Sequence, residues 1–461
     1  METVPRQLED LLKSILSGPM HPQLTYVDGV TFQGIYNLAM PLRKWLQKNV
    51  PKEEVCLLYA DDKAVIMAAL LAALFETRIL ILPNAHSFKG VDALKRTTGC
   101  RYAIMDKSRS LPEDIAVIVA SDFRFKSPVK RFQSKEELTI EPDAVWVQLY
   151  TGGSTAEPKV WNKTIRNLMG EALFLSHKFK INSEDRVVAS VPVYHIYGLL
   201  YSILVPFIAS AYVCQAMPYY PKEISQTLDA KSATILISVP PHYRALGRHL
   251  CKNDTLRLAF SSAGMLAAED GQAFTRNNDV EVVEIYGSTE TGGVATRIRA
   301  KGETAFTPFE CVTVKIEAEQ LWVKSDFLSP GLKRLDSDFF KLNDRVQLSY
   351  DGQFRLLGRT DGVLKVGGRR IDSETIRQAF FDQAGVTDVA ILSIPLLNGR
   401  ENQIVAVVEG TVEPPILSKK IASTLEAYAR PRSIKVVEKM PYTEAGKYNR
   451  NALMALFKSR S

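Results

Sequence analysis

The chain has 461 residues, of which 46% are hydrophobic and 24% are charged. A chain of this length and composition is expected to form two or three globular domains around a large core. The net charge of +7 is modest and is not gathered in a basic tail. This argues against a nucleic-acid-binding protein but suits an acidic partner or a phosphate-rich ligand. The five cysteines show neither close pairing nor zinc-ligand spacing, so a reducing cytoplasm is the expected location.

The first residues, METVPRQLEDLLKSIL, are charged and helix-like. They lack the basic, apolar and small-residue order of a signal peptide, so export is not expected. Further along, the apolar run that starts at Val65 is broken by Glu76 and Arg78. The run ends before it reaches the ~20 residues that are needed to cross a bilayer. It therefore predicts a buried helix.

A strand-like segment, AVWVQLY, leads into TGGSTAEPK, residues 151–159. Glycine amides and hydroxyls gathered in this way suit an anionic ligand, and the lysine adds a compact positive charge. The segment lacks the Gly-Lys-Ser/Thr end of a P-loop, which disfavours an ordinary P-loop kinase or GTPase. Taken alone, a cluster of this kind more often marks a flexible surface turn than a ligand site.

The next segment is free of charge, because no Asp, Glu, Lys or Arg occurs between Arg186 and Lys222. It is long enough to span a membrane, but Pro192, Pro206, Pro218 and several polar residues interrupt it. We expect a buried helix followed by a strand, with a transmembrane span as the alternative.

Short β-branched runs then alternate with helical stretches as far as YGSTETGG. This pattern predicts parallel strands joined by crossover helices. The strand ends read SVPPHY, SSAGM and YGSTETGG. Because ligands of such sheets bind at the carboxyl ends of the strands, these turns and the segment 151–159 are expected to face one crevice.

Beyond Gly293 the pattern changes to alternating strands, VTVKIEAEQLWVKS and RVQLSYDGQFRLLG, with a two-residue turn at Asp351-Gly352. They predict a small antiparallel barrel or sheet. From Gly362 on, the glycine-rich VLKVGGRRID, the strands DVAILSIP and NQIVAVVEG, a helix LSKKIASTLEAYA that stops before Pro431, and a strand SIKVVEKMP predict a compact α+β unit.

Five segments in this order resemble motifs of one enzyme family: TGGSTAEPK, PVYHIYGL, YGSTE, GRTDGVLKVGGRRI and PYTEAGKYNR. The chain resembles the adenylate-forming superfamily, which includes acyl- and aryl-CoA synthetases, stand-alone acid–carrier protein ligases, peptide-synthetase adenylation domains and firefly luciferase. The resemblance implies an α/β fold. A large N-terminal adenylation domain, residues 1–360, would combine parallel α/β subdomains with a small β-barrel. A small α+β lid, residues 361–461, would rotate between two half-reactions.

The resemblance implies an ATP- and magnesium-dependent ligase that adenylates an acyl or aryl carboxylic acid. The acyl-AMP would then pass to the phosphopantetheine thiol of CoA or of an acyl carrier protein. Neither nucleic acid nor a membrane span is implied. An amino-acid-activating enzyme is an alternative.

The resemblance also assigns roles at the nucleotide. Tyr286 would stack on adenine, Thr289 would reach the α-phosphate as a catalytic residue, and Glu290 would hold Mg²⁺, which takes oxygen ligands. Asp344 would accept both ribose hydroxyls. The implied nucleotide-binding set is Thr151, Gly153, Ser154, Thr155, Lys159, Ala263, Gly264, Tyr286, Gly287, Asp344 and Arg359.

By the same resemblance, Lys447 is the catalytic lysine. Its charge would neutralise the repulsion between the attacking carboxylate and the α-phosphate. Asp361 would be the hinge between the domains, and Gly368 would line the thiol tunnel.

His195 distinguishes subfamilies, because amino-acid-activating members carry an aspartate near this element. Its presence therefore favours an acid without an α-amino group, and His195 is also assigned a catalytic role. The implied substrate-binding set is Tyr194, His195, Ser262, Ala263, Gly264, Gly292 and Gly293.

The chain departs from the family pattern at Gly152, Ala156 and Leu342-Asn343. These departures leave open a nucleotide-binding protein of the same fold that has lost its chemistry. From Gly362 on there are 15 Lys/Arg and 10 Asp/Glu, a surplus of 15 − 10 = +5. This surplus suits the phosphates of CoA and an acidic carrier protein equally.

Overall fold

The computed structural model describes residues 4–83, 88–123, 140–151, 159–247, 253–334, 338–359, 363–366, 369–395, 402–425, 429–444 and 446–457. The chain divides into two compact units. The first unit comprises Met1–Glu303, Phe309–Val312 and Lys324–Lys333. The second comprises Thr304–Pro308, Thr313–Val323 and Arg334–Ser461. The expected boundary at residue 360 stays a prediction, and Asp361 lies outside the described residues.

The first unit contains two largely parallel sheets. In one of them the strands follow the order β6-β5-β3-β4-β7-β8. Their bounds are Ala116–Val119, Tyr102–Met105, Val55–Tyr59, Ile79–Leu82, Val145–Thr151 and Lys159–Thr164. Neighbouring strands are parallel except for β7 and β8, which pair antiparallel. The predicted phosphate loop thus connects the two strands of this pair, and its residues 152–158 lie outside the described residues.

Helix α3 (Lys63–Glu76) is buried from Lys63 to Phe75, as predicted for the apolar run at Val65. The side chain of Asp62 caps its first turn by accepting hydrogen bonds from the N–H groups of Ala64 and Val65. The other helices of this part are α1 (Val4–Ser17), α2 (Phe32–Asn49), α4 (Phe88–Thr98) and the 3₁₀ turn η1 (Ala120–Phe123).

In the second sheet, the strands of the first unit follow the order β14-β13-β12-β11-β9-β10-β1-β2. Their bounds are Gly292–Ile298, Val282–Ser288, Leu258–Ser261, Ile235–Ser238, Arg186–Ala189, Tyr212–Val213, Thr25–Val27 and Val30–Thr31. The strands from β13 to β1 are parallel, and β14 and β2 pair antiparallel with their neighbours. The parallel sheet predicted for this region is confirmed.

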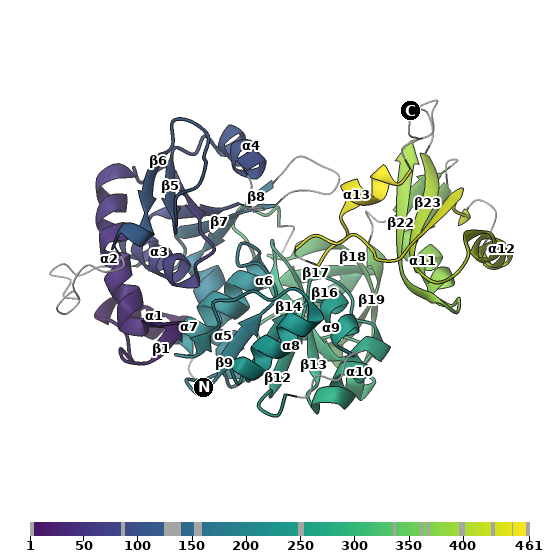
Figure 1. Ribbon diagram of the computed structural model, residues 1–461, viewed down its shortest axis with the longest axis horizontal. Coiled ribbons are helices and arrows are strands. Elements are labelled where there is room, and N and C mark those ends of the chain that lie inside the picture. The colour runs from purple at the N-terminus through teal and green to yellow at the C-terminus, as the bar shows by residue number, and fades with distance from the viewer. Residues whose placement is uncertain are drawn as a thin grey trace. The chain divides into compact units, whose positions relative to one another are not determined.

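Crossover helices α8 (Pro221–Ala230), α9 (Pro240–Gly247) and α10 (Ala268–Asn278) lie together over one face of this sheet (Figure 1). Leu236 stands beside Val188 and Ala259 in register, and all three belong to the hydrophobic cluster under these helices. Because side chains alternate along a strand, the next residue of β12, Phe260, faces the other side. The short 3₁₀ turn η4 (Arg299–Lys301) follows β14.

The charge-free segment forms buried helical turns followed by a strand, as predicted. Its turns are α6 (Ile196–Leu199), the π-helical η3 (Leu200–Leu204) and α7 (Val205–Ile208), and the strand is β10. A second π-helical turn, η2 (Arg166–Gly170), leads into α5 (Glu171–Lys178). Among the described residues no helix has the length and apolar character of a membrane span.

The second unit contains a small sheet in the order β16-β17-β18-β19. Its strands are Thr313–Glu317, Gln320–Lys324, Phe340–Leu348 and Phe354–Arg359, and the unit also includes β15 (Thr307–Pro308). Strand β18 is antiparallel to β17 and β19. The predicted turn, within η5 (Tyr350–Gly352), is present, since Asp351 and Gly352 both have positive φ, as a type I′ turn requires.

The last part of this unit is α+β, as predicted. Strands β22 (Val386–Pro395), β23 (Asn402–Gly410) and β24 (Ser433–Val437) form one sheet. Helices α11 (Ser373–Phe381) and α12 (Pro414–Thr424) pack on one face, while Met440 and α13 (Arg450–Ala455) pack on the other (Figure 1). A hairpin, β20 (Val363–Val366) with β21 (Arg369–Asp372), precedes them. The predicted helix before Pro431 ends earlier, at Thr424, because Leu425 already has extended backbone.

Candidate active site

The YGSTE motif forms the tip of the hairpin between β13 and β14. Ser288 and Thr291 close this tip, since their hydroxyl oxygens lie 3.0 Å apart and each also accepts the other residue's N–H. The side chains of Thr289 and Glu290, which lie between them, form no hydrogen bond with any residue that the structure describes. The hairpin therefore presents a hydroxyl and a carboxylate whose hydrogen-bonding capacity is not used within the described chain.

Two glycines allow this hairpin to close tightly. A Cβ on Gly287 would overlap the carbonyl oxygen of Gly292. Gly292 itself has φ +67°, a conformation that residues with a Cβ rarely adopt. Gly287 of the motif is thus required by close backbone packing, and Gly292 beyond it by its left-handed backbone.

Two buried charged residues, Lys163 and Glu171, form hydrogen bonds with the backbone of the hairpin. Lys163 is 0% exposed, and its ammonium donates to the carbonyl oxygens of Phe327 at 3.0 Å and Glu290 at 3.4 Å. Glu171 is 1% exposed, and its Oε1 accepts the N–H of Gly293 at 2.7 Å. Burial lowers the pKa of Lys163 to about 8 and raises the pKa of Glu171 to about 7, and the attraction between the two charges opposes both shifts.

Neither Lys163 nor Glu171 was predicted from the sequence. Lys163 is the second-last residue of the strand KVWNKT, where an alternating lysine resembles a solvated side chain. Glu171 gave a usable signal, because it is the only charge in the otherwise apolar stretch LMGEALFL. A lone carboxylate on the apolar side of a helix is rarely buried without a reason.

The phosphate loop is only partly described. Register pairs Thr151 with Lys159 across β7 and β8. The ammonium of Lys159 lies 5.9 Å from the centre of the Trp161 ring, within the range of a cation–π contact. The loop residues Gly153, Ser154 and Thr155 lie outside the described residues, so their phosphate contacts stay predictions.

The PVYHIYGL motif places His195 immediately before α6, with its ring 4.9 Å from that of Tyr194. Near it lies a polar cluster that the sequence did not predict. The hydroxyl of Ser190 is 2.7 Å from that of Ser238 and 2.9 Å from Nδ1 of His242. Ser190 follows the end of β9, Ser238 ends β11, and His242 lies beyond it. Ser238 and His242 belong to the SVPPHY turn, which was expected to face the crevice.

The SSAGM turn carries backbone strain. Ala263 has φ +69°, a left-handed conformation that costs about 1–2 kcal/mol for a residue with a Cβ. Ser262 anchors the turn by donating to the carbonyl of Ile285 at 3.0 Å. On the other side, the buried carboxylate of Glu284 accepts the N–H of Leu266 and pairs with Arg297 at 2.7 Å. Strain held by its surroundings in this way is typical of ligand sites.

In the second unit, Asp344 and Arg359 are register partners across β18 and β19, so two predicted ribose contacts are neighbours. The departure at Leu342 has a structural reason, since that side chain is buried in the core of the unit, 5% exposed. Asn343 could replace the family's glycine by adopting a left-handed conformation, but it lies in β18 without positive φ. No left-handed residue is needed here.

Lys447 lies in a tight turn with an exposed side chain. The N–H of Thr443 donates to the carbonyl of Lys447 at 2.7 Å, and Gly446 turns the chain with φ +73°. On either side of the turn, the rings of Tyr442 and Tyr448 stack 5.5 Å apart. The predicted catalytic lysine thus projects from a closed loop.

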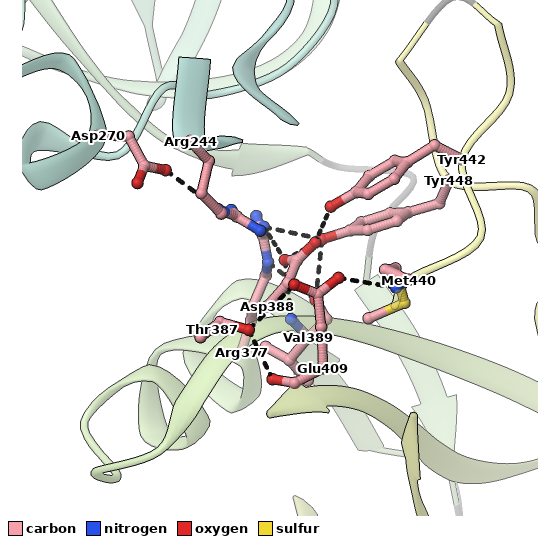
Figure 2. A network of polar contacts seen from close by, with 10 residues as sticks. All are labelled: Arg244, Asp270, Arg377, Thr387, Asp388, Val389, Glu409, Met440, Tyr442 and Tyr448. Atoms are coloured by element: carbon pink, nitrogen blue, oxygen red, sulfur yellow. Dashed lines mark hydrogen bonds and ion pairs between the residues drawn. The ribbon is translucent and has the colours of Figure 1, made fainter. Parts of the chain in front are cut away.

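A buried carboxylate fixes this loop to β22 (Figure 2). Asp388, 1% exposed, accepts the hydroxyl of Tyr448 at 2.6 Å and also the hydroxyl of Tyr442. Arg377 donates to the Tyr448 oxygen at 3.0 Å and lies 3.4 Å from Asp388. We call these four residues the tyrosine clamp. The predicted tunnel residue Gly368 lies outside the described residues.

Comparison with known proteins identifies the family. The model of the AMP-binding enzymes matches residues 17–323. The chain belongs to this family. It is 29% identical over 306 residues to 4-coumarate–CoA ligase of Cereibacter sphaeroides, covering 64% of this chain and 68% of that protein. The resemblance predicted from the motifs is confirmed, and the predicted activity agrees with the name of this relative.

Solved structures confirm the fold. The ATP-bound MatB of Rhodopseudomonas palustris superposes with a TM-score of 0.82 at 18% identity, covering 97% of this chain and 98% of that one. O-succinylbenzoate coenzyme A synthetase from Bacillus subtilis, in complex with ATP and magnesium ion, gives 0.80 at 17% identity, with 97% and 98% covered. These matches span both predicted domains.

Proposed function

We propose that this chain is an AMP-forming acid–thiol ligase. In the first half-reaction a carboxylate oxygen attacks the α-phosphorus of ATP, the bond to the β-phosphate breaks, and pyrophosphate leaves. In the second, a thiol sulfur attacks the acyl carbon and AMP leaves. The observation that carries this proposal is the β13–β14 hairpin, which presents the Thr289 hydroxyl and the Glu290 carboxylate on a supported turn in a chain that belongs to the AMP-binding enzymes.

Glu290 suits a magnesium ligand. Its carboxylate accepts no hydrogen bond from the described residues, and its backbone is held by Lys163 and by the N–H of Ser329 at 2.8 Å. A carboxylate on a fixed turn is the type of oxygen ligand that Mg²⁺ takes together with phosphate oxygens. When bound, the ion would neutralise charge on the phosphates.

Lys447 would supply the second positive charge. A primary ammonium on an exposed turn can approach two anions at once, and it lowers the barrier by reducing their repulsion in the transition state. The tyrosine clamp restricts the backbone from which the lysine projects. Less loop entropy is therefore lost when the lysine binds the carboxylate and the α-phosphate.

The acid is proposed to lack an α-amino group, because the PVYHIYGL element carries His195 and no aspartate. The name of the 4-coumarate–CoA ligase supports an acyl or aryl acid. An amino-acid-activating enzyme would need a carboxylate placed for the substrate's ammonium group.

The thiol acceptor is proposed to be CoA or an acyl carrier protein. The name of the relative supports CoA. The surplus of 15 − 10 = +5 charges from Gly362 on also suits an acidic carrier protein. A cytoplasmic location stays a prediction from the cysteine pattern.

The test is exchange of labelled pyrophosphate into ATP over a panel of aryl, fatty and amino acids. We expect exchange with at least one acid that lacks an α-amino group, and then thioester formation with CoA or a phosphopantetheinylated carrier protein. Retained ATP binding without exchange for any acid would show instead a nucleotide-binding protein that has lost ligase chemistry. Exchange with amino acids alone would favour the amino-acid-activating alternative.

A further inference from the structure

Several polar side-chain atoms of the first unit are fully buried without a hydrogen-bond partner in the described structure. Two of them, Oε2 of Glu171 and the hydroxyl of Tyr201, lie on neighbouring elements. Buried polar atoms are nearly always paired, because an unpaired one loses its bonds to water without replacement. Two such atoms on neighbouring elements, α5 and η3, call for a partner from outside the chain.

The two side chains lie where three predicted acid-binding segments come together. Glu171 contacts the glycine turn, since a Cβ on Gly292 would overlap Oε2. Tyr201 follows His195 on the same helical segment. Its ring lies 5.1 Å from that of Phe260, and Phe260 is in the strand that leads into the SSAGM turn. The unpaired atoms therefore lie beside the elements that are expected to enclose the acid.

Helix α5, which carries Glu171, and the turn η3, which carries Tyr201, pack against each other. Burial raises the pKa of Tyr201 well above its ordinary value, and the charge of Glu171 raises it further. Lys163 attracts Glu171, but the Lys163 ammonium donates its hydrogen bonds to the carbonyls of Phe327 and Glu290. The lysine therefore balances the charge of Glu171 and leaves Oε2 available.

We propose that Glu171 and Tyr201 bind a hydroxyl group at the end of the substrate acid remote from its reacting carboxylate, so that the chain activates a hydroxy acid. This inference rests on the proposed function. A hydroxyl satisfies both groups at once, because it donates to the Glu171 carboxylate and accepts from the Tyr201 hydroxyl. A second carboxylate has no proton to donate, and it is repelled by Glu171 wherever Glu171 is ionised, above its pKa of about 7. An unsubstituted chain or ring would leave both atoms unpaired.

Aromatic side chains surround the pair. Tyr201 contacts Tyr197 at 5.0 Å between ring centres as well as Phe260, and the ring of Phe309 would overlap a Cβ on Gly293. Such surroundings suit an apolar or aromatic body between the two polar ends of the acid.

The test compares acids that differ by one hydroxyl: benzoate with 4-hydroxybenzoate, cinnamate with 4-coumarate, and octanoate with 8-hydroxyoctanoate. The activity readout is the acid-dependent exchange of pyrophosphate, and the binding readout is the rise in melting temperature with each acid. We expect the wild type to prefer the hydroxylated member of at least one pair by at least about 10-fold in kcat/KM, because sites that bind a substrate hydroxyl reject analogues without it.

The variant Tyr201→Phe separates recognition from structure. It should reduce this preference several-fold and leave the melting temperature of the ligand-free protein unchanged or raised, because the hydroxyl that it removes has no partner. Tyr243→Phe is the matched control. That buried hydroxyl donates to the carbonyl of Phe260 at 2.7 Å, so its loss should lower the melting temperature and keep the preference.

The inference is overturned if acids support exchange but no hydroxylated acid is preferred. It is also overturned if Tyr201→Phe lowers the melting temperature as Tyr243→Phe does and leaves the preference unchanged. Absence of exchange with every acid, together with no thermal shift by any hydroxy acid, would overturn the proposed function itself and this inference with it.

Discussion

Glu171 in the first unit and Asp388 in the second are both buried carboxylates, each 1% exposed, but they are satisfied very differently. Asp388 accepts hydrogen bonds from two tyrosine hydroxyls and from the N–H of Val389, with Arg377 close by. Glu171 accepts one N–H, and its second oxygen has no partner among the described residues.

The difference in hydrogen bonding indicates that Asp388 and Glu171 have different roles. A carboxylate with a complete shell of donors holds its neighbours in one arrangement, and here it holds the loop of Lys447. A carboxylate with an unused oxygen keeps capacity for a ligand at the expense of stability. We therefore expect the degree of hydrogen-bond satisfaction to separate the positioning role proposed for Asp388 from the recognition role proposed for Glu171.

The largest expected effect is at the residue that the satisfied carboxylate positions. Lys447→Ala should lower pyrophosphate exchange by at least about 100-fold, because removal of one transition-state electrostatic contact typically costs that much. Transfer of a supplied acyl-adenylate to the thiol should persist. Equal loss of both half-reactions would mean that the role of the lysine is misassigned.

An intermediate effect is expected when the shell of Asp388 is broken. Asp388→Asn removes the charge opposite Arg377 and leaves one acceptor for two tyrosine hydroxyls, so it should lower the free energy of unfolding by about 2–3 kcal/mol. Urea unfolding measures this. Asp382→Asn is the control, because among the described residues its exposed carboxylate accepts a hydrogen bond only from Gln378. A change within about 0.5 kcal/mol is expected.

The same variant sharpens the link to catalysis. If the clamp positions Lys447, Asp388→Asn should lower exchange less than Lys447→Ala does and leave thiol transfer intact. Loss of stability with unchanged exchange would show that the clamp has only a structural role.

The smallest expected effect is a change in how stability varies with pH. The folded state raises the pKa of Glu171 from 4.5 to about 7 through burial. The stability that this protonated carboxyl provides is complete below pH 4.5 and is lost as the pH rises to about 7. Glu171→Gln should therefore gain stability relative to the wild type between pH 5 and 7.5, by at most about 3 kcal/mol.

Melting temperatures of both proteins across this range provide the measurement. Lys163 and Tyr201 face the carboxylate but titrate at higher pH, since the pKa of Lys163 is lowered only to about 8. A constant difference between the two proteins would mean that Glu171 is already ionised at pH 5.

Most helices, strands and turns could be predicted from local sequence patterns, because each is determined by residues within one short segment. The helix at Val65 and the strands β11, β12 and β13 are short runs with one periodicity and clear ends, and the Asp351-Gly352 turn follows from backbone preferences alone. The helix before Pro431 was predicted too long, since its periodicity continues past the residue where the backbone becomes extended.

Site residues could be predicted only where they lie within one contiguous sequence motif. The hairpin of Tyr286–Glu290 and the turn of Lys447 are contiguous in sequence. Lys163 and Glu171 bind backbone groups 127 and 122 residues away, and Asp388 contacts Tyr448 60 residues away. Such contacts arise from packing between distant segments, which no periodicity within one segment reports.

The position of β1 in the second sheet predicts how a truncated fragment of the chain would behave. This strand comes from residues 25–27, yet it pairs with β10 in a sheet whose other parallel strands all lie beyond residue 185. A fragment starting at the charge-free segment would leave an open strand edge at Tyr212–Val213, which invites self-association. Expression of the second sheet alone should therefore yield aggregates, whereas supplying residues 20–50 as a separate peptide offers a route to rescue by complementation.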